Sequence, residues 1–223
     1  MKHFFKTHRH ILWALYFVVY LAGFFLVERI VPTEGYHVMY HPLDDRIPFC
    51  EYFIVFYYIW YLFIGGTALY LIFADAPAFR RYMWFFMISF SFTLIFNVTY
   101  PNGQDLRPDL SALGRDNLFI RLIEMIYAAD TNTNVCPSMH VIGSFAAMFA
   151  VFDCKRLRKT VVAPILAVLL TILVSASTVL VKQHSIVDVF WGVIASAVVF
   201  VIVYGLLRKK ADLLEIKKEK SLI

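Results

Sequence analysis

Long apolar runs constrain the fold of this chain more than any other feature of its sequence. The 223 residues are 61% hydrophobic and 17% aromatic, and the mean hydropathy is +0.69. A soluble domain of this length carries more polar surface than such values allow. We therefore predict an integral membrane protein whose length suits one bundle of spanning helices and no separate soluble domain.

Six segments are predicted to cross the membrane, which gives an all-α, six-span transmembrane bundle. Most hold about 20 residues, enough for about 30 Å of helix and so for the hydrocarbon core of a bilayer. The spans are 11–31, 51–73, 82–100, 138–153, 161–181 and 185–207. The first is expected to stay uncleaved, because its apolar run is too long for a signal peptide and lacks a small-residue cleavage pattern. One domain is expected over 1–223, with its motif-bearing core at about 100–207.

The longest connection, 101–137, is predicted to contain an amphipathic helix lying on the membrane surface. Asp116 is expected to cap the N-terminus of this helix. Its apolar face is predicted to consist of Leu118, Phe119, Leu122, Ile123 and Ile126. A shorter loop is expected at 74–81, between the second and third spans.

Basic residues are distributed unevenly between the two sides of the predicted bundle. One side holds 15 of the 21 Lys and Arg residues: Lys2, Lys6, Arg9, Arg80, Arg81, Lys155, Arg156, Arg158, Lys159, Arg208, Lys209, Lys210, Lys217, Lys218 and Lys220. The positive-inside rule then places both termini in the cytoplasm. With its six spans, the chain is expected to be a multi-pass protein of the cell membrane. Because the bases lie in short clusters beside apolar runs, no nucleic-acid partner is expected.

Two motifs each place a histidine at the extracytoplasmic edge of the membrane. His184 and Asp188 are four residues apart, which on a helix puts them on one face with roughly 6 Å between Cβ atoms. The carboxylate can then hold one imidazole nitrogen and leave the other as a base or nucleophile. In the second motif, Pro137 and Ser138 indicate a helix start, whose free amides bind anions, just before His140.

Each of these features alone would also suit a polar turn, or a helix end that faces lipid headgroups. Arg107 and Lys182 add two cations on the same side of the membrane. Two imidazoles, a carboxylate, two cations and a capped helix start on one face favour phosphoryl transfer over chance assembly.

The motifs resemble those of the type 2 phosphatidic acid phosphatase and haloperoxidase superfamily. The segment 136–140, Cys-Pro-Ser-Met-His, is similar to the Pro-Ser-Gly-His motif of that family, and 184–188 is similar to its His-x-x-x-Asp motif. Arg107 and Pro108 resemble the end of its Lys-(six residues)-Arg-Pro motif. The order, spacing and sidedness of the motifs agree with the family, and so does the six-span arrangement.

The chain also departs from the family pattern. Tyr100 stands where the family has the first-motif lysine, and Met139 stands where it has glycine. Ser177 and Thr178 stand near the place of a Ser-Arg pair. Lys182 is predicted to supply part of the missing charge. The sequence Lys-Gln-His at 182–184 resembles the branch that includes the inositol phosphorylceramide synthases.

The resemblance implies a role for each motif residue. His184 would attack phosphorus, with Asp188 fixing its tautomer, and His140 would protonate the leaving oxygen and then activate the acceptor. The predicted phosphate-binding residues are Arg107, Ser138, Met139 and Lys182. No cofactor is expected, and no metal, because too few carboxylate and histidine ligands cluster here.

The expected function is that of a lipid phosphate phosphatase, which cleaves a phosphomonoester or diphosphate lipid through a phosphohistidine. A lipid headgroup phosphotransferase is the alternative within the family. A proton-coupled transporter and an inactive lipid-binding scaffold are alternatives from other classes. The expected partners are a lipid phosphate and the bilayer, and the oligomeric state is left open. Cys50 and Cys136 could form a disulfide or stay free thiols.

Overall fold

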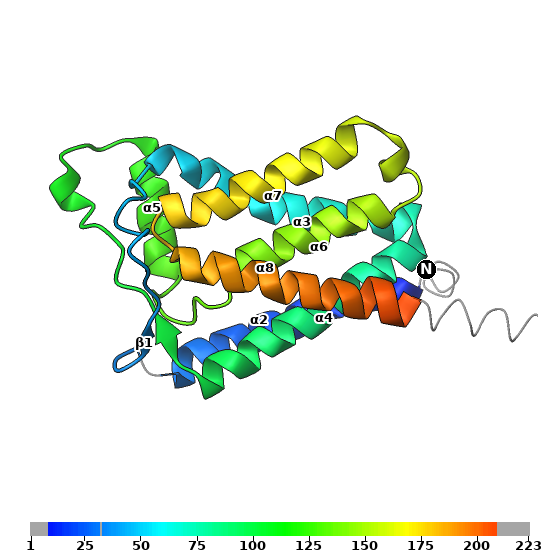
Figure 1. Cartoon of the computed structure of the whole chain (residues 1–223), viewed down its shortest axis with the longest axis horizontal. Helices are drawn as coiled ribbons and strands as arrows, with labels where there is room; N and C mark the ends of the chain where they lie inside the picture. Colours follow the sequence, from blue (N-terminus) through cyan, green and yellow to red (C-terminus); the bar gives the residue numbers. More distant parts are fainter. Residues whose placement is uncertain (1–8, 32, 209–223) are drawn as a thin grey trace, which may run out of the picture.

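The computed structural model describes residues 9–31 and 33–208, and it is predominantly helical. Six helices run side by side along the long axis, while α5 (Leu118–Ala129) lies across one end of the bundle (Figure 1). The six are α2 (Leu15–Ile30), α3 (Ile54–Ala74), α4 (Ala76–Thr99), α6 (Met139–Asp153), α7 (Val162–Leu180) and α8 (Ile186–Phe200). Short 3-10 turns precede α2 at Arg9–Ala14 and α3 at Glu51–Phe53, and α8 continues as a π-helix over Val201–Leu207.

Five of these helices, counted with their short extensions, are long and apolar enough to cross a membrane. They cover Arg9–Ile30, Glu51–Ala74, Ala76–Thr99, Val162–Leu180 and Ile186–Leu207. Helix α6 is apolar but shorter, with 15 residues. It packs against α3, α4, α7 and α8, and most of its residues are buried. A helix enclosed in this way meets other helices rather than lipid.

The loop predicted at 74–81 consists of one residue, Asp75, in the structure. Helix α4 already begins at Ala76, because the Asp75 side chain accepts a hydrogen bond from the Ala78 amide at 3.1 Å and so caps the first turn. Pro77 fits in that turn because the first helical amides need no intrahelical partner. Arg80 and Arg81 therefore lie on the helix. The expectation of a longer loop was wrong because the apolar pattern alone did not identify the cap.

Helix α5 is present, but its predicted cap was wrong. Asn117 accepts hydrogen bonds from the amides of Phe119 and Ile120, whereas Asp116 forms an ion pair with Arg121 at 2.9 Å. The buried positions of α5 are Ile120, Ile123 and Ile126. Ile123 and Ile126 pack with Ile54, Tyr57 and Val181, so α5 closes the end of the bundle where α3 begins and α7 ends. Its position on a membrane surface stays a prediction.

The segment before α3 folds back over the same end of the bundle. Strand β1 (His37–Val38) pairs in parallel with β2 (Asn102–Gly103), which joins the loop after α2 to the loop after α4. Gly103 is required here because a Cβ at this position would lie 2.7 Å from the Tyr36 ring. The two long loops therefore form one layer over the N-termini of α6 and α8.

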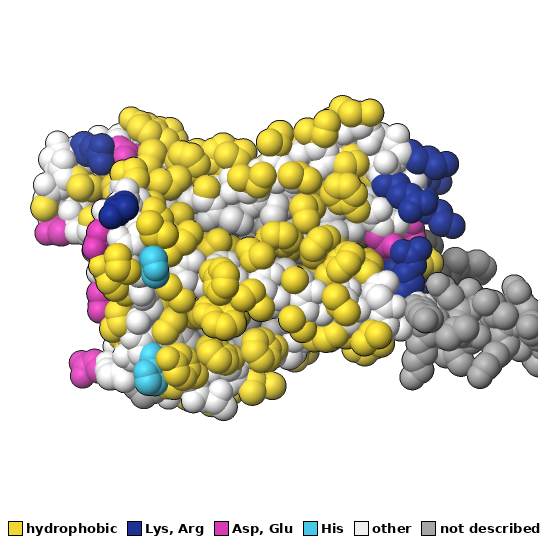
Figure 2. Space-filling view, in the orientation of Figure 1, with side chains coloured by type: hydrophobic (Ala, Val, Ile, Leu, Met, Phe, Trp, Pro, Cys, Tyr) yellow, Lys and Arg dark blue, Asp and Glu magenta, His cyan; other side chains and the backbone are white. Residues whose placement is uncertain are grey.

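Charge separates between the two ends of the molecule. The loop after α6 holds Lys155, Arg156, Arg158 and Lys159, and this end appears as a dark-blue cluster in Figure 2. Arg81 and Arg208 both pair with Asp153 there, at 2.7 and 3.3 Å. The remaining tail bases, and both chain termini, lie outside the described residues. The opposite end carries α5 and the long loops.

Candidate active site

The two histidine motifs, 44 residues apart between His140 and His184, meet at the end of the bundle covered by the long loops. The Ser138 amide donates a hydrogen bond to the Asp188 carbonyl at 3.1 Å, and the His140 and His184 ring centroids are 5.7 Å apart. Helices α6 and α8 can approach this closely because of Gly192. A Cβ there would lie 2.9 Å from Val141 and 3.1 Å from the Ser138 carbonyl oxygen.

His184 and Asp188 form a pair, although they do not share a helix. The structure places His184 in the turn before α8, and Asp188 in the first turn of that helix. The His184 Nδ1 atom lies 3.3 Å from Asp188 Oδ2, which also accepts the Ser185 amide hydrogen at 2.9 Å. Ser185 and Asp188 complete a reciprocal capping box, so the helix start itself aims the carboxylate. The pairing was predicted, but its cause is the cap rather than a shared helical face.

The His140 ring lies between two aromatic side chains of α3. Its centroid is 4.2 Å from that of Tyr57 and 4.4 Å from that of Trp60. Gly143, one turn further along α6, leaves room for Trp60, because a Cβ there would lie 2.8 Å from the indole. The His140 Nε2 atom is buried and has no hydrogen-bond partner in the described structure. An unpaired buried nitrogen costs free energy unless a ligand pairs with it.

The N-terminus of α6 provides amides beside the two histidines. Ser138 is the N-cap, and its Oγ accepts the Val141 amide hydrogen at 3.5 Å. The amides of Met139 and His140 belong to the first helical turn and have no partner within the helix. The Met139 side chain turns the other way and contacts the Tyr20 hydroxyl. Any role of Met139 in anion binding would therefore come from its backbone.

Arg107 reaches the same region from the loop after α4. Its guanidinium donates to the carbonyl oxygen of Tyr127 in the last turn of α5, to those of Asp130 and Thr131 just after it, and to the Gln183 side chain, next to His184. It also lies over the Tyr127 ring, 4.4 Å from the centroid. Its Nε is buried without a partner in the described structure. Arg107 therefore places a fixed positive charge at the site, and its Nε–H group is available to a ligand.

Lys182 has a different environment from the one its sequence position indicated. Its ammonium donates to the carbonyl oxygens of Asp44 and Ile47, at 2.8 and 2.6 Å. Lys182 is only 9% exposed. A phosphate contact by Lys182 would require these two hydrogen bonds to break, so this geometry does not support the predicted role.

Asp44, which the sequence did not single out, connects the loop before α3 to the start of α8. Its carboxylate accepts hydrogen bonds from Ser185 Oγ at 2.6 Å, from the Ile186 amide at 2.8 Å and from the His41 amide at 2.9 Å. The side chain is buried, and a carboxylate at a helix N-terminus is stabilised by the helix dipole. Asp44 and Lys182 together hold the 39–50 loop against the turn that carries His184.

Asn102 and Gln104 fix the loops around the site from a second direction. The Asn102 side chain accepts the Cys136 amide hydrogen at 2.8 Å and donates to the Cys136 carbonyl at 3.4 Å. The Gln104 side chain donates to the Lys182 carbonyl at 3.0 Å. Both residues are fully buried. The turn signal at 101–103 indicated a loop here but gave no indication of these contacts.

The three cysteines are free thiols in the structure, which favours the second of the two alternatives for Cys50 and Cys136. Burial and the charge of nearby Asp188 raise the pKa of the Cys136 thiol, so the thiol stays protonated beside this carboxylate. The second oxygen of Asp188, Oδ1, is buried and has no hydrogen-bond partner in the described structure. Among the described residues, no three His, Cys, Asp or Glu side chains are arranged to hold a metal ion.

Asp130 is a second acidic group near the site that the sequence did not reveal. Burial, followed by the charge of Glu28, raises the pKa of Asp130 to about 6, while His184 and Arg107 lower it in part. Glu28 accepts hydrogen bonds from Thr131 and Asn134, at 2.6 Å each. The carboxylate of Asp130 therefore lies within electrostatic reach of Glu28, His184 and Arg107.

We expect Asp130→Asn to stabilise the folded protein at pH 8 and to have no such effect at pH 4. The folded-state pKa is raised, so the folded state binds more protons than the unfolded state between about pH 4 and pH 6. Stability therefore falls as pH rises through this window, by at most about 3 kcal/mol. Thermal unfolding in detergent at the two pH values measures the effect. Glu124→Gln, on the exposed face of α5, is the control, and an equal gain at both pH values would contradict the assignment.

Comparison with known proteins adds a family match to this geometry. Residues 102–212 match the model of the PAP2 superfamily, whose members are phosphoric ester hydrolases or phosphotransferases. The matched segment contains both histidine motifs and Arg107. Comparisons with curated proteins and with solved structures gave no match. The apolar helices and the family match together support a membrane protein with a phosphatase-type function.

Proposed function

We propose, from the match to the PAP2 superfamily, that this chain is a membrane enzyme that hydrolyses a phosphomonoester or diphosphate lipid at the extracytoplasmic face. One observation carries the proposal: His140, His184 and Asp188 lie together beside the free amides of α6, at one end of an apolar bundle. That position lets a lipid headgroup reach the histidines while its chains stay among the helices.

The proposed first step is an in-line attack on phosphorus by the Nε2 atom of His184. A bond forms between this nitrogen and phosphorus, and the bond between phosphorus and the lipid oxygen breaks. The Nδ1–H group of His184 donates a hydrogen bond to Asp188, which fixes the tautomer and stabilises the positively charged ring. His140 gives its proton to the departing lipid oxygen.

The second step proceeds through the same groups in reverse. His140, now neutral, takes a proton from water, and the water oxygen attacks the phosphohistidine. The nitrogen–phosphorus bond breaks, and His184 returns to its starting form. The Tyr57 and Trp60 rings hold the His140 ring in place during both steps.

The nonbridging phosphate oxygens are proposed to bind Ser138, the backbone amides of Met139 and His140, and Arg107. These groups present donors at a helix N-terminus and a fixed cation beside His184. Lys182 is assigned a different role from the predicted one. Its ammonium holds the 39–50 loop, so it positions the His184 turn instead of contacting phosphate.

Helix α6 is proposed as the sixth span. It is short for a membrane crossing, but it is enclosed by four other helices and therefore needs less contact with lipid. With six spans, the N- and C-terminal segments share a side, and the basic loop after α6 marks that side as cytoplasmic. The histidines then face outward.

Sidedness can be tested by labelling thiols in intact cells. We expect Ser111→Cys, in the exposed loop before α5, to react with a membrane-impermeant maleimide when the three native cysteines are replaced. Arg156→Cys, in the basic loop after α6, is the matched site on the other side and should react only after lysis. The reverse pattern would contradict the proposed orientation.

The function itself is tested by incubating the purified protein with a panel of lipid phosphates. The panel holds phosphatidate, phosphatidylglycerol phosphate, a polyprenyl diphosphate and a sphingolipid donor, each with and without an alcohol acceptor. We expect free phosphate, and we expect EDTA to leave turnover unchanged. New lipids formed in place of phosphate would identify a headgroup phosphotransferase, while no turnover on any member would contradict the proposal.

A further inference from the structure

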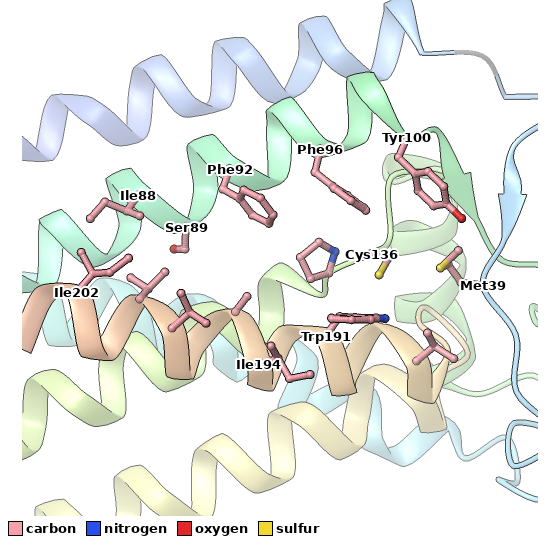
Figure 3. Close-up of a pocket in the computed structure, with 15 residues that line it drawn as sticks. Met39, Ile88, Ser89, Phe92, Phe96, Tyr100, Cys136, Trp191, Ile194 and Ile202 are labelled. Carbon is pink, nitrogen blue, oxygen red and sulfur yellow. The ribbon is translucent and has the colours of Figure 1, made fainter.

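A long apolar groove lies between α4 and α8, on the reverse side of the catalytic turn. We call it the α4/α8 groove and define it by Ser89, Phe96, Tyr100, Cys136, Trp191 and Ala195. Its volume is about 590 Å³. Figure 3 shows the side chains of α4, among them Phe92 and Phe96, on one side of the groove and Trp191 of α8 on the other.

The lining is made by one stripe from each helix. On α4 the lining positions follow one helical face from Ile88 to Phe96 and end at the C-cap Tyr100, and on α8 they follow one face from Val187. No charged side chain lines the groove. Its buried serine, Ser89, already donates to the Phe85 carbonyl of its own helix. An occupant therefore finds mostly hydrocarbon on both walls, with the Tyr100 hydroxyl and the Trp191 indole as the main polar groups.

The dimensions of the groove suit a chain from one leaflet of a bilayer. Ile88 on α4 and its C-cap Tyr100 are 12 positions apart, about 18 Å along the helix axis. One leaflet contributes about half of a hydrocarbon core of about 30 Å. Tyr100 closes the outer end, and its ring stacks on His37 at 4.1 Å with an angle of 3°. Tyrosine favours this position because its ring is apolar and its hydroxyl reaches the headgroup level.

The groove is separated from the reacting histidines. None of Ser138, His140, His184 and Asp188 lines it, and Asp188 is fully buried. The wall between them is the Cys136–Pro137 segment, which leads into Ser138, whose amide donates to the Asp188 carbonyl at 3.1 Å. A lipid chain in the groove therefore presses on the back of the turn that leads into Ser138, without reaching His184.

We propose that the α4/α8 groove binds one acyl chain of a bilayer phospholipid that is not the lipid being cleaved. This bound lipid supports the Cys136–Pro137 segment from behind and places its headgroup beside Tyr100 and His37. The proposal depends on the membrane location of the helices, but not on the proposed catalytic steps.

Photocrosslinking tests the site directly. The protein is reconstituted in vesicles of phosphatidylcholine that carry a diazirine midway along one chain, and the crosslinked peptides are mapped by mass spectrometry. We expect crosslinks to concentrate on the groove faces of α4 and α8. Ala195→Phe, which fills the groove, should reduce them at least fivefold. Val193, on the lipid-facing side of α8, is 40% exposed, and Val193→Phe adds a phenylalanine outside the groove and should leave the crosslinks unchanged.

A second measurement uses the unmodified groove and guards against misfolding of the filled variant. The fluorescence of Trp191 is obtained as the part of the signal that Trp191→Phe removes, and brominated phosphatidylcholine chains should quench it. After dilution into unbrominated vesicles, the quenching of Trp191 should last longer than the quenching of the lipid-facing Trp84. Equal exchange at both tryptophans, or crosslinks spread evenly over the outer surface, would indicate ordinary surrounding lipid and overturn the proposal. Displacement of the probe by a lipid phosphate, but not by phosphatidylcholine, would identify the substrate's own chain and overturn it as well.

Discussion

His184→Asn is expected to abolish both turnover and the covalent intermediate, whereas His140→Asn is expected to accumulate that intermediate. His184 has its Nδ1 atom committed to Asp188 and so has its Nε2 atom free to attack phosphorus. Asparagine at this position supplies no comparable nucleophile. The loss of turnover should be complete within the sensitivity of the assay.

His140→Asn removes the acid of the first step and the base of the second. With a good leaving group such as nitrophenyl phosphate, protonation of the departing oxygen matters little, so the first step can proceed. The second step still lacks its base, so phosphoenzyme should build up. The ring of His140 also fills the space between Tyr57 and Trp60, so the fold of this variant must be checked by its melting temperature.

The measurement is the phosphoenzyme trapped by rapid quench, which should be acid-labile and base-stable as phosphohistidine is. His41→Asn, an exposed histidine in the loop over the same end of the molecule, is the control and should behave as the parent enzyme. Phosphate on His140 in the His184 variant would reverse the two roles. The absence of phosphoenzyme in every variant would favour direct attack by water.

Asp188→Asn is expected to slow both steps by about 10⁴-fold, which is what loss of the correct histidine tautomer costs a Ser-His-Asp triad. The amide can keep an oxygen at the Oδ2 position, where it still accepts the Ser185 amide hydrogen. Its nitrogen then takes the Oδ1 position, which has no hydrogen-bond partner in the described structure. The capping box is then retained while the negative charge is lost. Phosphoenzyme should still form, only slowly.

Single-turnover rates of formation and decay of the phosphoenzyme measure this effect separately from folding. Asp109→Asn makes the same chemical change on an exposed loop of the same end and should leave both rates unchanged. Rates within tenfold of the parent enzyme for Asp188→Asn would mean that the carboxylate only caps α8. If the Asp188→Asn protein does not fold, the carboxylate has the same structural role, and Asp188→Glu is then expected not to fold either.

The sequence alone determined the features that depend on neighbouring residues. Apolar runs of about 20 residues predicted the helices, and Ser138 and Ser185 marked the starts of α6 and α8, because caps and runs act within one or two turns. It also predicted that His140, His184 and Asp188 form one site, because both motifs lie at helix starts on the same side of a single helical bundle.

Only the tertiary structure decided which charges face the site. Lys182 and Arg107 are equally basic in the sequence, yet Lys182 is held by carbonyls of the 39–50 loop while Arg107 lies beside Gln183. The contacts of Asp44 with Ser185 and Ile186 span more than 140 positions and follow no periodic pattern. The α4/α8 groove likewise exists because apolar residues on two helices that are distant in the sequence line one cavity. Such arrangements depend on how distant segments pack, so they cannot be predicted from local sequence patterns.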